Sequence, residues 1–361
     1  MTALTAGRLP AEWLGETRTH GPAHPATRLS SVACRALVKP AILGGTLVGL
    51  TVNRVAPQVL QRTSLAWIDA PRLLAPPVSG VRVRRVQLPT CRAEWLQPRP
   101  RRTSAAIIYF HGSAFIVGGL NSHRPFASRL AALSDVPVLN VAYSMRPKGE
   151  LEDAIQQGVD AYHHAVSRGA DPRRIILAGD SAGGFMAAMV AIRLRDLGLP
   201  QPAGQVLLSP VTDNHMESKL DGVGRWGDAM FPRATLQFIN HVYIRRNGTV
   251  EADAGPAQLE LAGLAPFLIH VGSGEVLRND AELLTERLRA SGVHAELDIY
   301  DQAPHVFQLT APVNPDANAA VRSIVDFVQR TTQTSARATS MSTRTRGWIR
   351  PGVRNVIPLG R

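Results

Sequence analysis

The chain of 361 residues has only two cysteines, Cys34 and Cys91, which are too few for a disulfide scaffold. They form neither a CxxC redox motif nor a zinc-finger spacing, and no other metal-binding motif is present. We therefore expect two reduced thiols in an intracellular, cytoplasmic protein that holds no metal. The first twenty residues also lack the apolar region of a signal peptide.

No apolar run reaches the roughly 20 residues that a transmembrane helix needs. The longest run, at 41–52, has 12 residues and contains Gly45 and Gly49 in a GxxxG spacing, between Lys39 and Arg54. Two interpretations of this run stay open. It is either a buried or surface-packed segment of the fold, or a segment that associates with a membrane.

Acidic residues are scarce at both ends of the chain, and this scarcity explains the net charge of +12. Residues 1–102 hold 15 Lys and Arg against 4 Asp and Glu, and residues 331–361 hold 6 against none. Residues 103–330 hold 19 against 24, so we expect no basic groove and no nucleic-acid partner there. The basic arms are expected either to be solvated tails or to make peripheral contact with an anionic membrane.

Composition divides the chain into four parts. Residues 1–40 carry four prolines among Thr, Ala and Arg, which predicts a flexible basic N-terminal arm. Residues 41–80 are interpreted as an N-terminal cap or packing segment, 81–330 as the main domain, and 331–361 as a disordered basic C-terminal tail. An insertion at about 210–256 is too long for one crossover, and we expect it to form a lid.

Short apolar runs alternate with helical stretches from residue 105 onward, which predicts a largely parallel sheet covered by helices on both faces. An alternating strand is predicted at 81–88, with a hairpin partner at 93–96. The other strands are predicted at 105–110, 136–141, 174–179, 204–209, 266–271 and 294–300. Helices are predicted near 122–134, 150–168, 182–197, 278–291 and 315–330, with a helical patch at 232–245 in the insertion.

The strongest chemical signal is the sequence GDSAG at 179–183. It follows an apolar strand and precedes an Ala-rich helix, which is the context of a nucleophile elbow. The tight turn lifts Ser181 into the site, and the helix N-terminus favours the negative charge that develops during attack. We expect Gly179, Asp180 and Gly183 to support this turn. An ordinary glycine-rich turn is the alternative.

A serine hydroxyl is a poor nucleophile without a base, and that base needs an orienting acid. After a nucleophile elbow, the acid and then the histidine follow in the chain. His305 lies in the loop after the last predicted strand, at the edge where parallel sheets build their sites. Packed or solvated positions suit the other histidines better: His163 and His164 lie on a helix, and His270 and His294 in strands.

The orienting acid is expected directly after the strand that precedes the histidine strand. Glu275 is the first carboxylate after that strand, so we predict that Glu275 is the acid. Asp280 is an alternative that fits the cap of the next helix equally well. Asp298 and Asp301 are the remaining alternatives.

Acyl transfer also needs N–H donors for the oxyanion. The sequence HGSAF, which begins at His111, follows a predicted strand where loops of the HGGG type occur. We expect the backbone N–H groups of Ser113, Ala114 and Ala182 to converge on the developing charge, with His111 and Gly112 supporting the loop. A plain loop is the alternative.

Taken together, these motifs resemble those of the hormone-sensitive-lipase-like carboxylesterases, also called family IV or α/β-hydrolase fold-3. HGSAF at 111–115 resembles the HGGGF loop of the family, and GDSAGG at 179–184 matches its nucleophile motif letter for letter. EVL at 275–277 resembles its acid motif, and HVF at 305–307 resembles its histidine motif. YSMRP at 143–147 is loosely similar to its YRLAPE turn.

The resemblance spans about residues 81–330 and implies an α/β-hydrolase catalytic domain. Its expected architecture is a mostly parallel eight-stranded sheet flanked by helices, with a cap formed by N-terminal and inserted segments. The implied function is a serine carboxylic-ester hydrolase without a cofactor, acting through an acyl-enzyme on short- to medium-chain acyl esters or lipid esters. Ser181 is then the nucleophile, His305 the base and Glu275 the acid.

Ser113 and Ala114 depart from the family pattern, because they replace two glycines of the oxyanion loop. A side chain at Ser113 is expected to crowd the acyl pocket or alter the loop, which predicts low activity or a narrow substrate range. Two other functions stay open. One is a non-catalytic binder of hydrophobic ligands on a hydrolase fold, and the other is an amidase or peptidase of the same fold.

Overall fold

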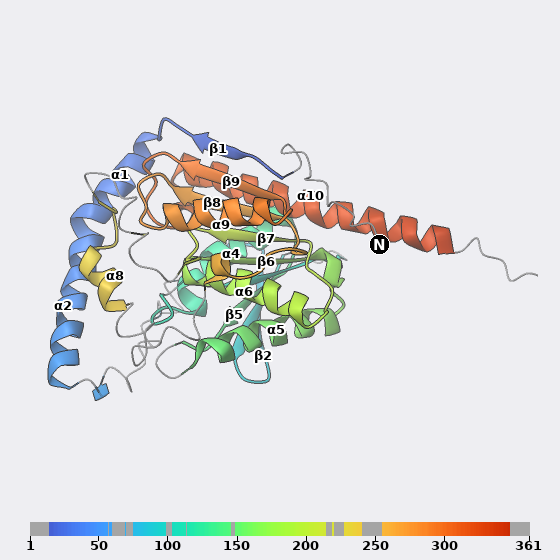
Figure 1. The fold of residues 1–361 in the computed structure, drawn as a ribbon, viewed down its shortest axis with the longest axis horizontal. Coiled ribbons are helices and arrows are strands. Elements are labelled where there is room, and N and C mark those ends of the chain that lie inside the picture. Colours follow the sequence, from blue (N-terminus) through green and yellow to red (C-terminus); the bar gives the residue numbers. More distant parts are fainter. Residues whose placement is uncertain are drawn as a thin grey trace, which may run out of the picture.

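A nine-stranded sheet runs through the centre of the computed structural model (Figure 1). The structure describes residues 14–56, 58–59, 69, 75–98, 103–112, 114–145, 149–213, 219, 227–239 and 255–346. Within them the strand order is β1-β9-β8-β7-β6-β4-β5-β3-β2, and all neighbours are parallel except the pairs β2–β3 and β3–β5. The strands are β1 (Thr17–His20), β2 (Arg82–Gln87), β3 (Arg92–Gln97), β4 (Ala106–Phe110), β5 (Val138–Ala142), β6 (Ile175–Asp180), β7 (Gly204–Leu208), β8 (Phe267–Gly272) and β9 (Ala295–Tyr300).

Helices cover both faces of the sheet, because the central parallel strands are apolar on both sides and must be buried on both. One core lies between the sheet and α5, α6 and α9, and the other between the sheet and α4 and α10. The helices are α1 (Pro25–Ala33), α2 (Lys39–Val55), α4 (Leu120–Ser134), α5 (Leu151–Ser167), α6 (Ala182–Asp196), α8 (Arg233–Ile239), α9 (Arg278–Ala290) and α10 (Pro315–Arg346). Shorter turns are the π-helical η2 (Cys34–Val38) and the 3-10 helices η4 (Pro172–Arg174), η7 (Pro256–Gln258) and η8 (Phe307–Thr310).

The predicted mostly parallel sheet with flanking helices is confirmed, but it has nine strands where the sequence predicts eight. The ninth, β1, comes from the segment predicted to be a flexible arm, and that prediction is wrong for residues 17–40, which form a strand and helices. The prediction of a disordered C-terminal tail is likewise wrong for residues 331–346, because α10 continues to Arg346. Residues 347–361 lie outside the described residues. Both cysteines are free thiols.

The helices α1 and α2 are joined through η2 into one continuous helix, Pro25–Val55 (Figure 1). Pro40 lies inside this helix, although it cannot donate a helical hydrogen bond. The chain passes it through η2, where the Lys39 N–H bonds the Cys34 carbonyl five residues back. The 12-residue run at 41–52 is therefore one part of a longer helix. The full helix of 31 residues is long and apolar enough, by length and composition alone, to cross a membrane.

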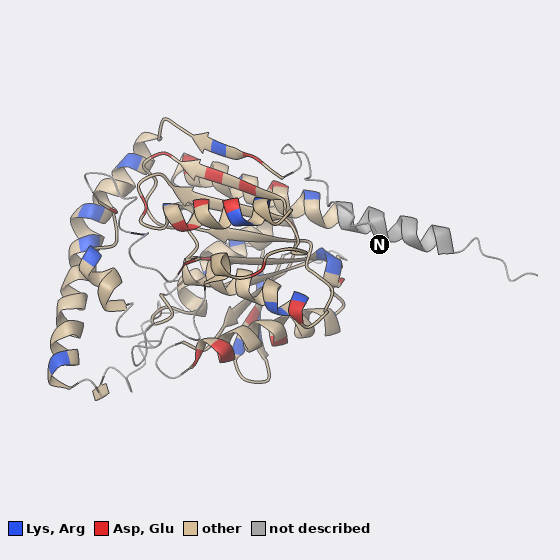
Figure 2. Cartoon of the chain, in the orientation of Figure 1, with Lys and Arg blue, Asp and Glu red and all other residues tan. Residues whose placement is uncertain are grey.

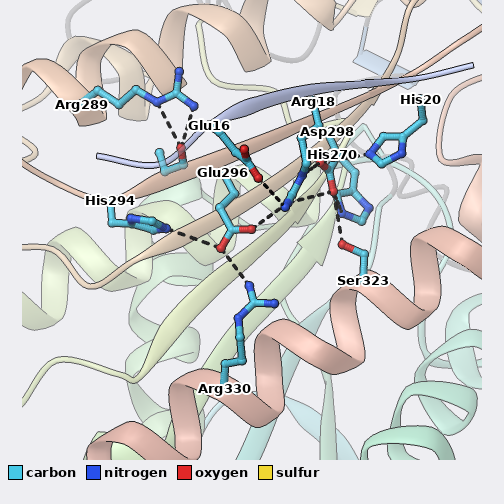
Figure 3. Close-up of polar contacts among 11 residues, drawn as sticks. Glu16, Arg18, His20, His270, Arg289, His294, Glu296, Asp298, Ser323 and Arg330 are labelled. Carbon is cyan, nitrogen blue, oxygen red and sulfur yellow. Dashed lines mark hydrogen bonds and ion pairs between the residues drawn. The ribbon is translucent and has the colours of Figure 1, made fainter. Parts of the chain in front are cut away.

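Charged contacts attach β1 to the edge of the sheet, in addition to its parallel pairing with β9 (Figure 3). The Arg18 guanidinium donates to Asp298 Oδ1 at 2.6 Å and to Glu296 Oε2 at 2.7 Å. The Nε2 atoms of His20 and His270 lie 3.1 and 3.2 Å from Asp298 carboxylate oxygens. Burial raises the pKa of Asp298, but His270, Arg18 and His20 outweigh it and hold that pKa well below its ordinary value.

Replacing Asp298 with asparagine is expected to lower the free energy of unfolding by about 2–3 kcal/mol, because Arg18 and His270 lose a buried anionic partner. Arg18 is partly exposed, so solvent screening keeps the loss below that of a fully buried pair. Urea unfolding at neutral pH measures the change. Because the folded pKa of Asp298 is lowered, this contribution is present above its unfolded pKa of about 3.9 and is lost as the pH falls further.

The matched control for this prediction is Glu16→Gln. Glu16 contacts the same Arg18 guanidinium at 3.0 Å, but its side chain is 65% exposed. Exposed ion pairs contribute little, so the control is expected to unfold like the wild type. Equal effects of the two substitutions would contradict the importance of the buried carboxylate.

Candidate active site

Ser181 stands in a sharp turn between β6 and α6. Its φ of 53° and ψ of −120° lie outside the usual regions for a residue with a side chain, as a nucleophile elbow requires. The Ser181 N–H donates to the Leu208 carbonyl at 2.8 Å, which fixes the turn against β7. A side chain at Gly183 would collide with the Phe110 carbonyl, and one at Gly179 with the backbone of Gly183. Both glycines are therefore needed for the close packing of this turn.

Glu275 and His305 are joined by a hydrogen bond. The distance from His305 Nδ1 to Glu275 Oε2 is 2.7 Å, and both side chains are buried. The other carboxylate oxygen, Oε1, accepts hydrogen bonds from the Gly272 N–H at 2.6 Å and from Ser209 Oγ at 2.7 Å. Glu275 is therefore held by two donors on one side and faces the imidazole on the other.

The parallel strands bring these residues to one edge of the sheet. Ser181, Ser209, Glu275 and His305 follow the carboxyl ends of β6, β7, β8 and β9, respectively, which are neighbours in the sheet. The Ser181 N–H bonds the last residue of β7, and the Ser209 N–H bonds the His270 carbonyl of β8 at 2.7 Å. The order of the chain thus becomes the order of neighbouring loops along the sheet edge.

The surroundings of His305 favour its protonated form. Burial lowers the pKa of this imidazole, but the hydrogen bond and charge of Glu275, with the charges of Asp228 and Asp180, outweigh it and raise the pKa. Asp228 belongs to the inserted segment and accepts a hydrogen bond from the Val276 N–H at 2.8 Å. The insertion is thereby tied to the loop that carries Glu275.

Asp180 holds the start of the expected oxyanion loop. Its Oδ1 accepts hydrogen bonds from the Gly112 N–H at 2.9 Å and from the Tyr109 hydroxyl at 2.5 Å. Its Oδ2 lies 3.3 Å from His123 Nε2, and His123 outweighs the effect of burial so that the pKa of Asp180 is lowered. Ala114, at φ 49°, continues the loop in the left-handed region, whereas Ser113 lies outside the described residues.

His111 precedes this loop and is fully buried. Burial lowers its pKa to about 4, so the ring is neutral at physiological pH. The Tyr143 hydroxyl donates to the His111 carbonyl at 2.8 Å, and the two rings stack with centroids 4.7 Å apart. The YSMRP turn therefore contacts the loop through its tyrosine, while residues 146–147 of that turn lie outside the described residues.

The alternative acids have other partners. Asp280 accepts hydrogen bonds from the backbone N–H groups of Thr212 and Asp213 and forms a buried ion pair with Lys219. Asp298 belongs to the cluster around Arg18, as described above (Figure 3). Asp301 accepts a hydrogen bond from the backbone of Ala23. Of the four carboxylates considered, Glu275 is the one whose hydrogen bond to His305 the structure records.

Comparison with known proteins relates this geometry to a family. Residues 107–309 match a family described by its alpha/beta hydrolase fold. The chain is 33% identical over 274 residues to Esterase LipU of Mycobacterium tuberculosis, covering 73% of this chain and 92% of LipU. It belongs to the hormone-sensitive-lipase-like esterases. The carboxylesterase/phospholipase LipF of the same organism is also 33% identical, over 86% of this chain and 83% of LipF.

Solved structures support the same membership of the hormone-sensitive-lipase-like esterases. A crystal structure of an esterase from the bacterial hormone-sensitive lipase family superposes with a TM-score of 0.67 and 31% identity, covering 72% of this chain and 88% of that one. A hormone-sensitive lipase from a metagenome library gives a TM-score of 0.66 and 30% identity, over 72% of this chain and 90% of that one. The family resemblance and the hydrolase fold predicted from the motifs are confirmed.

Ser209 is a member of this esterase site that sequence reasoning missed. Its hydroxyl donates to Glu275, and its Oγ accepts a hydrogen bond from the Val306 N–H at 3.3 Å, so one side chain joins the acid loop to the histidine loop. Both Ser209 and Val306 have positive φ values, 45° and 51°. The sequence signal that could have identified Ser209 is its position directly after an apolar strand that neighbours the nucleophile strand.

A cavity of about 340 Å³ opens beside the histidine of this esterase. Its lining includes Glu275 and His305, together with Arg28 and Arg35 of the N-terminal helix. Phe231 of the inserted segment packs its ring edge-on to His305, with centroids 5.0 Å apart. Among the described residues, no group of three His, Cys, Asp or Glu side chains is placed to hold a metal ion.

Proposed function

We propose that this chain hydrolyses carboxylic esters through an acyl-enzyme on Ser181, with His305 as the base and Glu275 as the orienting acid. The observation that carries the proposal is the 2.7 Å bond between His305 and Glu275, at the sheet edge where the Ser181 turn ends. The relatives are named as esterases and a carboxylesterase/phospholipase, which supports a carboxylic-ester hydrolase. A non-catalytic binder and an amidase or peptidase are not favoured.

The hydrogen bond between His305 and Glu275 supports the proton path of this proposal. Because Nδ1 of His305 donates to Glu275, its Nε2 is left to accept the proton of Ser181. Ser181 Oγ then attacks the ester carbonyl, and His305 returns the proton to the departing alcohol. Water, deprotonated by the same imidazole, releases the acid in a second round. Glu275 stabilises the imidazolium that forms in both rounds.

The developing oxyanion is proposed to bind backbone N–H groups. Ala182 is the first residue of α6, so its N–H has no partner within that helix and is available to an anion. Ser113 and Ala114 supply the other donors, and the bond from Gly112 to Asp180 supports the start of their loop. A helix N-terminus also favours negative charge at this place.

Labelling with a fluorophosphonate probe tests the proposal directly. We expect the probe to modify Ser181, identified by peptide mass spectrometry, and prior reaction to remove the ester hydrolase activity. Modification at another serine with loss of activity would contradict the assignment. A chain that binds the probe without covalent reaction would support the non-catalytic binder instead.

Short- to medium-chain acyl esters are the proposed substrates, as the resemblance to the hormone-sensitive-lipase-like esterases implies. A series of nitrophenyl esters from acetyl to palmitoyl is expected to show the highest kcat/KM among the shorter chains. A maximum at palmitoyl would contradict this.

We also propose that the protein is cytoplasmic and that its basic ends make peripheral contact with anionic membranes. Residues 347–361 contain three arginines and no acidic residue. Salt-sensitive binding to anionic vesicles that weakens when these residues are deleted would support this contact. Unchanged binding after the deletion would contradict it.

A further inference from the structure

The continuous helix Pro25–Val55 presents an apolar stripe to solvent. Its members recur mostly at intervals of three and four residues, so they lie along one face of the helix. All of them are exposed, Leu29 by 69%, Leu47 by 55% and Val55 by 82%. We call the following residues the apolar stripe: Leu29, Val32, Ala36, Pro40, Leu43, Leu47 and Val55.

The opposite face of the same helix is already packed against the inserted segment. Thr46 Oγ1 and Thr235 Oγ1 lie 2.8 Å apart, and the Lys39 ammonium donates to the Asp228 carbonyl at 2.7 Å. Gly49 faces the ring of Phe238 so closely that a side chain there would collide with it. Figure 1 shows the helix at the outer edge of the molecule, with α8 on its inner side. The apolar stripe therefore faces outward.

The charges of this helix all have the same sign. Arg28, Arg35, Lys39 and Arg54 are its charged residues, and the chain has no Asp or Glu between Glu16 and Asp69. In Figure 2 the ribbon of α1 and α2 is coloured for basic residues and for no acidic residue. An exposed apolar face bordered only by cations is complementary to an apolar surface that carries negative charge.

We propose that the apolar stripe docks the protein on the surface of an anionic lipid bilayer, with the helix, about 46 Å long, lying in the plane of the interface. A second copy fits less well, since two such helices would bring eight cations together without an acidic partner. Spanning the bilayer would strip the polar contacts to Thr235 and Asp228 from the inner face.

Such docking would hold the hydrolase at a membrane surface, which ester hydrolysis alone does not require. Arg28 and Arg35 of this helix line the cavity that also reaches Glu275 and His305. A lipid surface under the apolar stripe therefore lies next to the cavity mouth. Esters dissolved in the bilayer then reach the site without crossing water.

The test is flotation of the full-length chain with vesicles of phosphatidylcholine, with and without one third phosphatidylglycerol. We expect binding to the anionic vesicles, weakened about 100-fold by Leu29→Gln with Leu47→Gln, since each buried leucine contributes roughly a factor of 10. Arg54→Gln is expected to weaken binding about five-fold, at low salt. Hydrolysis of a soluble acetyl ester is expected to be unchanged in all of these variants.

Leu133→Gln with Leu197→Gln is the matched control, because these leucines are 49% and 55% exposed on α4 and after α6. We expect this control to bind vesicles like the wild type. Three results would overturn the proposal: no vesicle binding by the wild type, equal binding by the stripe variant, or a wild-type dimer that the stripe variant converts to a monomer. The last result would assign the stripe to a second copy. We expect the Ser181→Ala protein to lose ester hydrolysis and to bind vesicles like the wild type. The failure of one proposal can therefore be distinguished from the failure of the other.

Discussion

Ser181→Ala is expected to lower kcat for a short-chain nitrophenyl ester by about 10⁶-fold, the loss that nucleophile removal causes in other serine hydrolases. The substitution removes only Oγ, while the N–H bond from residue 181 to the Leu208 carbonyl does not depend on the side chain. The elbow therefore stays in place without its nucleophile. Steady-state kinetics with a stopped assay that detects slow turnover measures the residual rate.

Ser134→Ala is the control for this substitution. Ser134 is also buried, but its hydroxyl donates to the Leu130 carbonyl within α4. We expect the control to retain wild-type kcat. A Ser181→Ala protein that keeps more than a few per cent of the wild-type rate would rule out the proposed acyl-enzyme.

Glu275→Gln is expected to lower kcat by about 10⁴-fold, as in other hydrolases whose orienting acid becomes an amide. The two donors at Oε1, Gly272 N–H and Ser209 Oγ, require an acceptor at that position, so the amide oxygen of the glutamine takes it. The NH₂ group then faces Nδ1 of His305. Nδ1 must accept instead of donate, which moves the ring proton to Nε2 and prevents that atom from taking the proton of Ser181.

The pH profile of the Glu275→Gln protein gives a second readout. The base acts only when neutral, so kcat/KM falls as the pH drops below the pKa of His305. Glu275 raises that pKa, so the acid limb of the wild type lies above the ordinary histidine value of about 6.5. Removing the carboxylate charge is expected to shift this limb to lower pH.

Asp280→Asn tests the alternative acid in the same assay. Asp280 is bound to Lys219 and to backbone N–H groups, so its loss is expected to reduce stability and leave the acid limb in place. An acid limb that moves in Asp280→Asn but not in Glu275→Gln would reverse the assignment of the two carboxylates.

The strands and helices of the central domain were predictable because their signals are local. Parallel strands buried on both faces read as short apolar runs, and each predicted run from 105 to 300 coincides with a strand to within two residues. The carboxyl ends of those strands then placed Ser181, Glu275 and His305 near one another in the prediction. The structure adds the geometry, in particular the bond between Glu275 and His305.

The N-terminal strand could not be predicted in this way. The sequence of β1, TRTH, has no apolar alternation, and this strand exists because it pairs with β9 and because Arg18 reaches Asp298, 280 positions later. Such stabilisation comes from tertiary contacts, which a local window does not contain. Ser209 was missed for a similar reason, because a hydroxyl at the end of a strand carries no periodic signal.

Both edges of the sheet are formed by short, basic strands. β1 has four residues and includes Arg18, and β2, RVRRVQ, carries Arg82, Arg84 and Arg85. Unpaired strand edges are the places where chains associate into aggregates, and lysine or arginine on an edge opposes this by charge repulsion. The surplus of arginine in the first hundred residues therefore also protects the folded chain from joining its sheet to that of another copy. Removal of residues 1–20 would delete β1 and leave the backbone edge of β9 unpaired and open to such joining.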